Sequence, residues 1–177
     1  ASGSRLRKGL AVVPVCFGIS FTATLLNQAE ALLHIYVDGS VSITTGAVEM
    51  GQGVQHRIRR VVALTLGIDE ARIHVDSTST RSVANVSPTA ASTGADLNGE
   101  AARQAALRVL TGLRPLAAEL LGCPPEAVVF AKDAATQADG RSIPWPELVA
   151  AAYARRLPLS ALAHYATPGL HFDPARN

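Results

Sequence analysis

The sequence is poor in cysteine, which excludes several classes of small protein. Only Cys16 and Cys123 are present among 177 residues, and they stand far apart along the chain. Two distant cysteines supply neither the disulfide framework of a small secreted domain nor a cysteine metal cage. We therefore expect a protein of a reducing compartment, the cytoplasm.

Long apolar runs and an excess of either charge are also missing. No apolar run approaches the roughly 20 residues of a membrane helix, and the first residues lack the charged, apolar and cleavage regions of a signal peptide. Sixteen Lys and Arg face fourteen Asp and Glu, so the formal net charge is +2. This charge creates no field that would draw the chain to nucleic acid or to an anionic membrane. We expect neither as a partner.

Aromatic residues and the motifs of familiar catalytic or metal sites are scarce as well. One basic run stands out, made up of His56, Arg57, Arg59 and Arg60. Because aromatics are only 5% of the sequence, we interpret this run as a solvated helix face and not as a nucleic-acid surface. The sequence has no HExxH, CxxC, GxSxG or P-loop motif, and its histidines show no ligand spacing.

The apolar residues that are present predict an α+β fold with a mixed sheet and packed helices. They make up 48% of the sequence, enough for one core or two small ones. Asp38-Gly39 separates the apolar stretches 31–37 and 40–46, which is typical of a β-hairpin. The apolar stretch 9–20 also indicates a strand, at an edge or a bulge because Pro14 has no amide hydrogen.

Three stretches have the composition or spacing of helices. Apolar residues recur at helical spacing over residues 54–66, and residues 144–156 open with proline early in the first turn. The stretch 90–121 is rich in Ala and Leu. It predicts one long helix or two, with Gly112 and Pro115 at the interruption.

Two short β-rich stretches follow the first two helices. Residues 72–78 and 126–130 each come after a helix, a Leu-Gly pair and an acidic turn, and Asp139-Gly140 marks a second tight turn. This weak internal repeat predicts two helix-to-strand units on a mixed sheet. The chain could then form two lobes, at about residues 1–85 and 86–177.

The stretch GAVEMGQGV, residues 46–54, places glycines and one carboxylate in front of the first predicted helix. Gly51 and Gly53 would let the backbone approach a ligand closely, and free N–H groups at a helix start favour an anion or an electron-rich heterocycle. Gln52 adds an amide that both donates and accepts hydrogen bonds. Taken alone, however, these residues favour an ordinary glycine-rich turn.

A second stretch, residues 86–99, combines hydroxyls with small side chains. Its hydroxyl residues are Ser87, Thr89, Ser92 and Thr93. Ala90 and Ala91 would let a bulky group sit close, and the hydroxyls offer short donors. The alternative is a helix N-cap, in which Ser or Thr satisfies first-turn amides and Asp96 complements the helix dipole.

Taken together, three stretches resemble the molybdenum hydroxylases, the family of xanthine dehydrogenases, aldehyde oxidases and carbon monoxide dehydrogenases. They are GAVEMGQGV, SPTAASTGADLNG and HYATPGLHFD, and residues 8–54 resemble the family's run into its glutamine loop. PTAAS is the variant of the xanthine branch. The resemblance covers essentially the whole chain, so it implies that residues 1–177 belong to a molybdopterin-binding region of the aldehyde oxidase and xanthine dehydrogenase type.

The resemblance also implies site residues. It assigns contacts with a molybdopterin cofactor to Gly51, Gln52, Gly53, Thr89, Ala90, Ala91 and Ser92. Among these, Ala91 would lie beside the molybdenum without being a side-chain ligand, and Ala90 would be its neighbour on the substrate side. Thr89 and Ser92 would bind the pterin side. Some relatives have a further serine at Gly94, so one cofactor contact would be absent here. Relatives often have threonine at His56 and a different run over residues 159–165, which leaves the substrate preference open.

By the same resemblance, the chain is an internal part of an enzyme that converts hypoxanthine and xanthine to urate with oxygen from water. Electrons would pass to iron–sulfur clusters and FAD in a partner subunit, and the rest of the molybdenum subunit would be the other partner. The family's catalytic glutamate would lie beyond Asn177, so no catalytic residue is expected here and the isolated chain should be inactive. Glu49 would brace its loop. The alternative is a module that keeps the fold without the cofactor.

Overall fold

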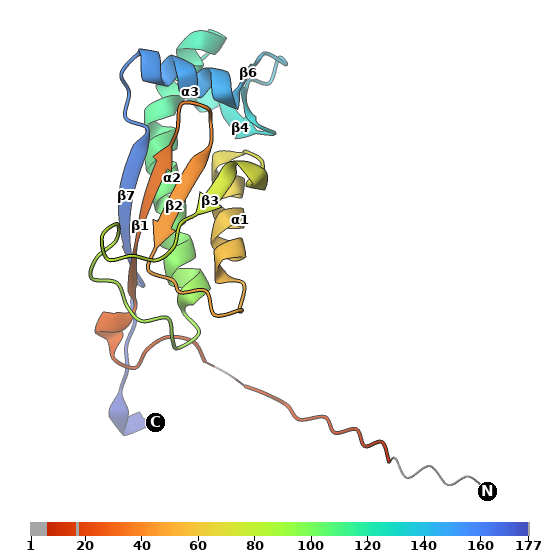
Figure 1. The fold of residues 1–177 in the computed structure, drawn as a ribbon, viewed down its shortest axis with the longest axis vertical. Coiled ribbons are helices and arrows are strands. Elements are labelled where there is room, and N and C mark those ends of the chain that lie inside the picture. The colour runs from red at the N-terminus through yellow and green to blue at the C-terminus, as the bar shows by residue number, and fades with distance from the viewer. Residues whose placement is uncertain (1–6, 17, 177) are drawn as a thin grey trace, which may run out of the picture.

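A four-stranded mixed sheet forms the centre of the protein (Figure 1). The computed structural model describes residues 7–16 and 18–176. The sheet has the order β3-β2-β1-β7 and consists of β1 (Gln28–Ile35), β2 (Val41–Thr45), β3 (Ile73–Val75) and β7 (Ser160–Ala166). β1 is antiparallel to both β2 and β7, whereas β2 and β3 are parallel. The predicted α+β class with a mixed sheet is confirmed.

The predicted hairpin is β1–β2, with Asp38-Gly39 at its turn. Gly39 has a φ of 83°, which a residue without a side chain adopts at no steric cost. The Asp38 carboxylate accepts a hydrogen bond from the Ser40 amide at 2.9 Å. Along β1, buried Leu33 and Ile35 alternate with half-buried Leu32 and His34. One face of the sheet is therefore the core face.

Two helices cover that face, α1 (Val54–Leu66) and α2 (Gly94–Leu121). The predicted helix over 54–66 is confirmed. α2 is one continuous helix, since Pro115 lies on its exposed side and the Thr111 carbonyl that loses its partner belongs to an exposed residue. The start expected at about residue 90 is wrong, because Ala91 and Ser92 have positive φ angles and the helix begins at Gly94.

A small second sheet lies near one end of α2, together with the third helix (Figure 1). It consists of β4 (Val129–Ala131), β5 (Ala134–Thr136) and β6 (Ser142–Pro144), followed by α3 (Trp145–Ala154). The four short 3-10 helices among the described residues are Thr24–Leu26, Glu70–Arg72, Pro125–Ala127 and Pro174–Arg176. The second helix-to-strand unit therefore leads to this separate sheet and not to the central one.

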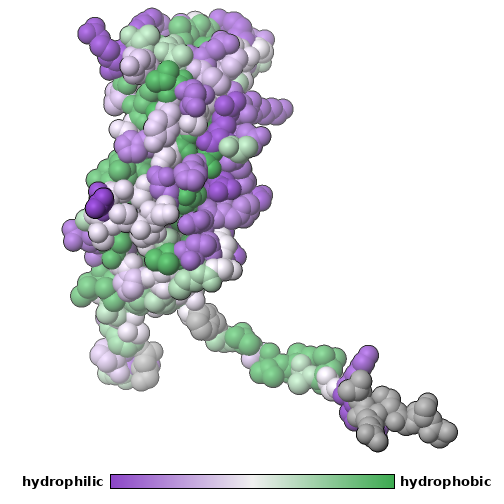
Figure 2. All heavy atoms as spheres, in the orientation of Figure 1, coloured by the Kyte–Doolittle hydropathy of each residue, from purple (hydrophilic) through white to green (hydrophobic). Residues whose placement is uncertain are grey.

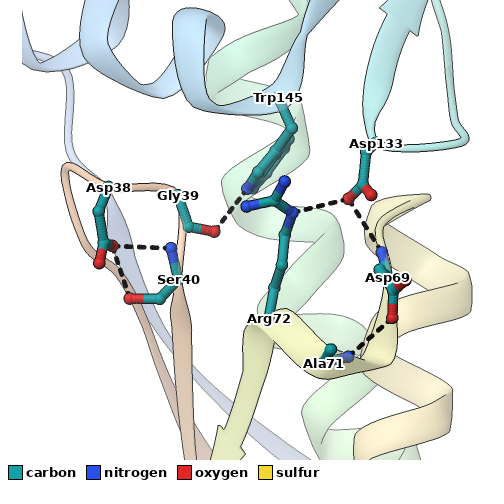
Figure 3. A network of polar contacts seen from close by, with 8 residues as sticks. All are labelled: Asp38, Gly39, Ser40, Asp69, Ala71, Arg72, Asp133 and Trp145. Carbon is teal, nitrogen blue, oxygen red and sulfur yellow. Dashed lines mark hydrogen bonds and ion pairs between the residues drawn. The ribbon is translucent and has the colours of Figure 1, made fainter.

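A polar network joins α3 to the hairpin and the small sheet to the segment between α1 and β3 (Figure 3). Trp145 is fully buried, and its Nε1 donates to the Gly39 carbonyl at 2.9 Å. Asp133 Oδ1 accepts hydrogen bonds from the Asp69 amide at 3.0 Å and from Arg72 Nε at 2.9 Å. These bonds fix this end of the molecule, which is the end of α1 away from the glycine-rich loop.

Two parts of the chain differ from expectation. β7 was not expected as a strand, yet it pairs with β1 along seven residue pairs, so the central sheet joins residues from both sides of position 85. The stretch 9–20 is wrong as a strand within this chain: its described residues lie outside both sheets. They form an extended arm with apolar side chains along it (Figures 1 and 2), and Leu10 is 95% exposed.

Within residues 7–16 and 18–176, no helix combines the length and the apolar character that crossing a bilayer needs.

Candidate functional site

Two loops that are distant in sequence meet at the start of α1. One is the stretch 46–53 before α1, and the other is the stretch 86–93 before α2. The Val48 amide donates to Thr89 Oγ1 at 2.9 Å, a bond that spans 41 positions of sequence. A hydroxyl oxygen that accepts still has its own hydrogen to donate. The contact therefore joins the loops and leaves one donor of Thr89 for a ligand.

A cavity of about 410 Å³ opens where these loops meet. Its lining residues are Met50, Gln52, Val54, Arg57, Thr89, Ala90, Ser92, Gly94 and Ala95. Four of the residues that the sequence suggested, Gln52, Thr89, Ala90 and Ser92, are thus brought together. Gly51, Gly53 and Ala91 are not part of the lining.

Glu49 occupies the place that the sequence suggested for an anion. One carboxylate oxygen accepts from the amides of Gly51 and Gly53, both at 2.9 Å, and the other accepts from the Gln55 amide at 3.1 Å. These bonds, led by those from Gln55 and Gly53, hold the pKa of Glu49 below its ordinary value. The expectation of free amides at the start of α1 is therefore wrong for these three groups.

The amide of Gln52 folds back onto its own loop. Its Oε1 accepts from the Met50 amide at 2.6 Å, and its Nε2 donates to the Val48 carbonyl at 2.8 Å. A primary amide has two N–H groups and two acceptor lone pairs. One N–H and one lone pair of Gln52 are left for a ligand in the cavity.

The glycines on either side allow this loop shape. Gly51 and Gly53 have φ angles of 96° and 77°, a region that side-chain-bearing residues seldom adopt. An added Cβ at either position would meet no heavy atom within 4 Å. Backbone conformation, and not crowding inside the chain, therefore requires glycine here.

The start of α2 contributes a different kind of group. Thr93 stands at the N-cap, but its side chain makes no capping bond and donates instead to the Ala90 carbonyl at 3.0 Å. The alternative in which Ser or Thr caps this helix is therefore not what the structure shows. Gly94 and Ala95, in the uncapped first turn, line the cavity. Amides of an uncapped first turn attract negative groups.

Ala91 lies in the tight turn that leads into α2. It has a φ of 51°, and Ser92 follows with 57°. The Ala91 carbonyl accepts from the Ser20 amide at 3.1 Å, so the segment before β1 braces this turn from outside. The placement of Ala91 beside a metal stays a prediction.

Arg57 is the functional candidate that sequence reasoning missed. We expected it on a solvated basic face, and it is indeed exposed, but its side chain also lines the cavity. The spacing could have found it, because Arg57 follows Val54 by three positions and residues three apart share a helix face. A basic residue in the first turn of α1 is thus the cation of the cavity wall.

The cavity combines neutral donors, one cation and an apolar floor. Such a set suits a ligand that carries both a polar heterocycle and negative charge. Side chains that could hold a metal ion directly are not grouped anywhere in residues 7–16 and 18–176: no three His, Cys, Asp or Glu residues come together there.

Comparison with known proteins assigns the class. A model of the molybdopterin cofactor-binding domain matches residues 1–177, and the chain belongs to this family. The xanthine dehydrogenase/oxidase of Rattus norvegicus is 40% identical over 167 residues, which cover 94% of this chain and 11% of that protein. The xanthine dehydrogenase of Drosophila subobscura is 39% identical over 171 residues, 97% of this chain and 11% of that protein.

A solved structure shows the same fold. The chain superposes on the reconstituted CO dehydrogenase from Oligotropha carboxidovorans with a TM-score of 0.70 and 23% identity, covering 79% of this chain and 18% of that one. The chain thus spans about a tenth of the length of the xanthine dehydrogenase relatives it matches.

Proposed function

We propose that the cavity between the two loops holds part of a molybdopterin cofactor. One observation carries this proposal: Gln52, Thr89, Ala90 and Ser92, which resemblance assigns to the cofactor, line one cavity although they come from separate parts of the chain. Membership in the cofactor-binding family supports the same assignment.

The residues of the cavity fit such a group. Thr89 and Gln52 each keep a donor for a ring edge, and Ala90 leaves room for a bulky ring system. Arg57 and the uncapped start of α2 suit its anionic part. Ala91 follows directly and would lie nearest the molybdenum. When bound, the cofactor supplies the redox chemistry of hydroxylation, and the protein supplies binding and orientation.

We further propose that this chain serves a xanthine dehydrogenase-type enzyme. Such an enzyme converts hypoxanthine and xanthine to urate, takes the new oxygen from water, and passes two electrons per step to iron–sulfur clusters and FAD in a partner subunit. The identity of about 40% to xanthine dehydrogenases supports this choice of substrate. Glu49 is engaged by three amides, so it is not free to act as the base. The family resemblance implies that the chain alone would not turn over purine.

A cavity-filling variant tests cofactor binding. In the full-length protein, expressed in a host that makes the cofactor, Ala90→Phe should abolish molybdenum and pterin content because the ring occupies the cavity. Ala150→Phe, at an exposed position of α3, is the matched control and should keep both. Molybdenum is measured by elemental analysis and pterin by fluorescence after oxidation. Equal contents in the two variants would refute the proposal, and a wild type without either would favour the cofactor-free module.

A further inference from the structure

We propose that Glu49 is a positioning residue: an internal anion that fills the N-terminus of α1 and so holds the Gln52 loop in its binding shape. The proposal rests on the proposed function, since it concerns the same cavity. Glu49 itself is not among the residues that line the cavity. Its effect on a ligand therefore acts through other residues.

The bonds of Glu49 enclose Gln52. One carboxylate oxygen accepts from Gly51 and from Gly53 at the same distance of 2.9 Å. These residues lie directly before and after Gln52, so backbone amides on both sides of the glutamine donate to the same oxygen atom of Glu49. Because both glycines have positive φ angles, the loop has conformational freedom that these bonds remove.

The second oxygen ties the loop to the helix. It accepts from the Gln55 amide at 3.1 Å, in the first turn of α1. A carboxylate at this place interacts favourably with the positive end of the helix dipole, and its bonds are charge-assisted. Glu49 therefore links the backbone on both sides of Gln52 to α1, the helix that carries Arg57.

The arrangement also makes the two helix starts unequal. The start of α1 is occupied by a carboxylate, whereas the N-cap residue of α2 makes no side-chain capping bond. At α1 the amides of Gly53 and Gln55 are therefore already bound by a carboxylate, whereas the N-cap side chain of α2 binds none of the first-turn amides. Glu49 in this way directs the ligand's negative part towards Gly94 and Ala95, which line the cavity.

Chemical rescue tests the inference. In the full-length protein, Glu49→Ala should lower molybdenum retention about tenfold, the scale of losing an outer-shell partner of a metal site. Formate added during cofactor loading should restore retention, because it fills the vacated anion position. Glu147→Ala removes an exposed carboxylate from the first turn of α3 and is the matched control. Its molybdenum retention should equal that of wild type and should not change with formate.

Two further measurements separate this inference from the proposed function. ¹³C-formate NMR on cofactor-free protein should detect an additional formate site in Glu49→Ala that wild type lacks, whether or not the cavity takes a cofactor. Glu49→Gln keeps the side-chain volume and one acceptor, so it should lose part of the molybdenum and gain nothing from formate. Absence of formate binding by the alanine variant, or equal rescue of the glutamine variant, would overturn the inference.

Discussion

The Val48 amide and the Thr89 hydroxyl form the one direct side-chain hydrogen bond between the two loops among the described residues, at 2.9 Å. The bond brings a loop that precedes α1 against a loop that precedes α2. Since Thr89 acts as the acceptor, its hydroxyl hydrogen remains available for a further partner. One neutral hydrogen bond thus joins two loops that lie 41 positions apart in the sequence.

Thr89→Val should loosen this junction. The substitution keeps the branched shape but removes the acceptor of the Val48 amide, so we expect a loss of about 0.5–1.5 kcal/mol in unfolding free energy. Thr89→Ser keeps the acceptor and should stay closer to wild type. Urea unfolding of the three proteins measures the difference. Equal losses for valine and serine would show that the hydroxyl does not join the loops.

Gln52→Ala should lower cofactor content more than it lowers stability. Its two bonds lie within an exposed loop, so each contributes only about 0.5–1.5 kcal/mol, whereas the cofactor would lose an amide contact. The molybdenum-to-protein ratio of the full-length protein is compared with that of Gln137→Ala, a partly buried glutamine beside the small sheet. If Gln52→Ala kept its full molybdenum content, Gln52 would not contact the cofactor.

Position 91 should prefer glycine to a branched residue. Ala91 has a φ of 51°, and a left-handed conformation costs a residue with Cβ about 1–2 kcal/mol. Ala91→Gly should therefore raise or preserve the melting temperature, and Ala91→Val should lower it. Scanning calorimetry compares the two. A valine variant as stable as the glycine variant would mean that the turn before α2 has another conformation.

Glu49 should make stability depend on pH in the acid range. Its folded pKa lies below the unfolded one because three amides bind the ionised form. The stabilisation is therefore complete above the unfolded value of about 4.3 and is lost as the pH falls through the folded value. Melting temperatures of wild type and Glu49→Gln should differ at pH 7 and converge towards pH 3. A gap that stays constant with pH would contradict this account.

The fold was predictable where local signals were strong. Asp38-Gly39 defined the hairpin and helical spacing defined α1, because turn chemistry and amphipathicity are properties of short segments. β7 could not be found this way, since its sequence SALAHYA is rich in alanine and low in strand propensity. It becomes a strand by pairing with β1, a contact between distant parts of the chain.

The site was predictable in composition but not in connectivity. The glycine and hydroxyl stretches pointed to Gln52 and Thr89. The role of Glu49 at the start of α1 was expected only from the family resemblance, as a residue that stabilises its own loop. Three amides converge on Glu49 because of loop geometry, which residue types alone do not reveal. Arg57 was assigned to a solvated face because the basic run was interpreted as a whole, although its three-residue spacing from Val54 placed it on the cavity side of α1.

The position of the molybdenum is the most direct test of the account. Crystals of the full-length protein loaded with cofactor would be measured at the molybdenum absorption edge, where anomalous scattering locates the metal without reference to the protein residues. The account predicts a peak beside the cavity formed by Gln52, Thr89 and Ala90, with Ala91 adjacent. A peak elsewhere in a loaded enzyme, with this cavity free of pterin, would contradict it.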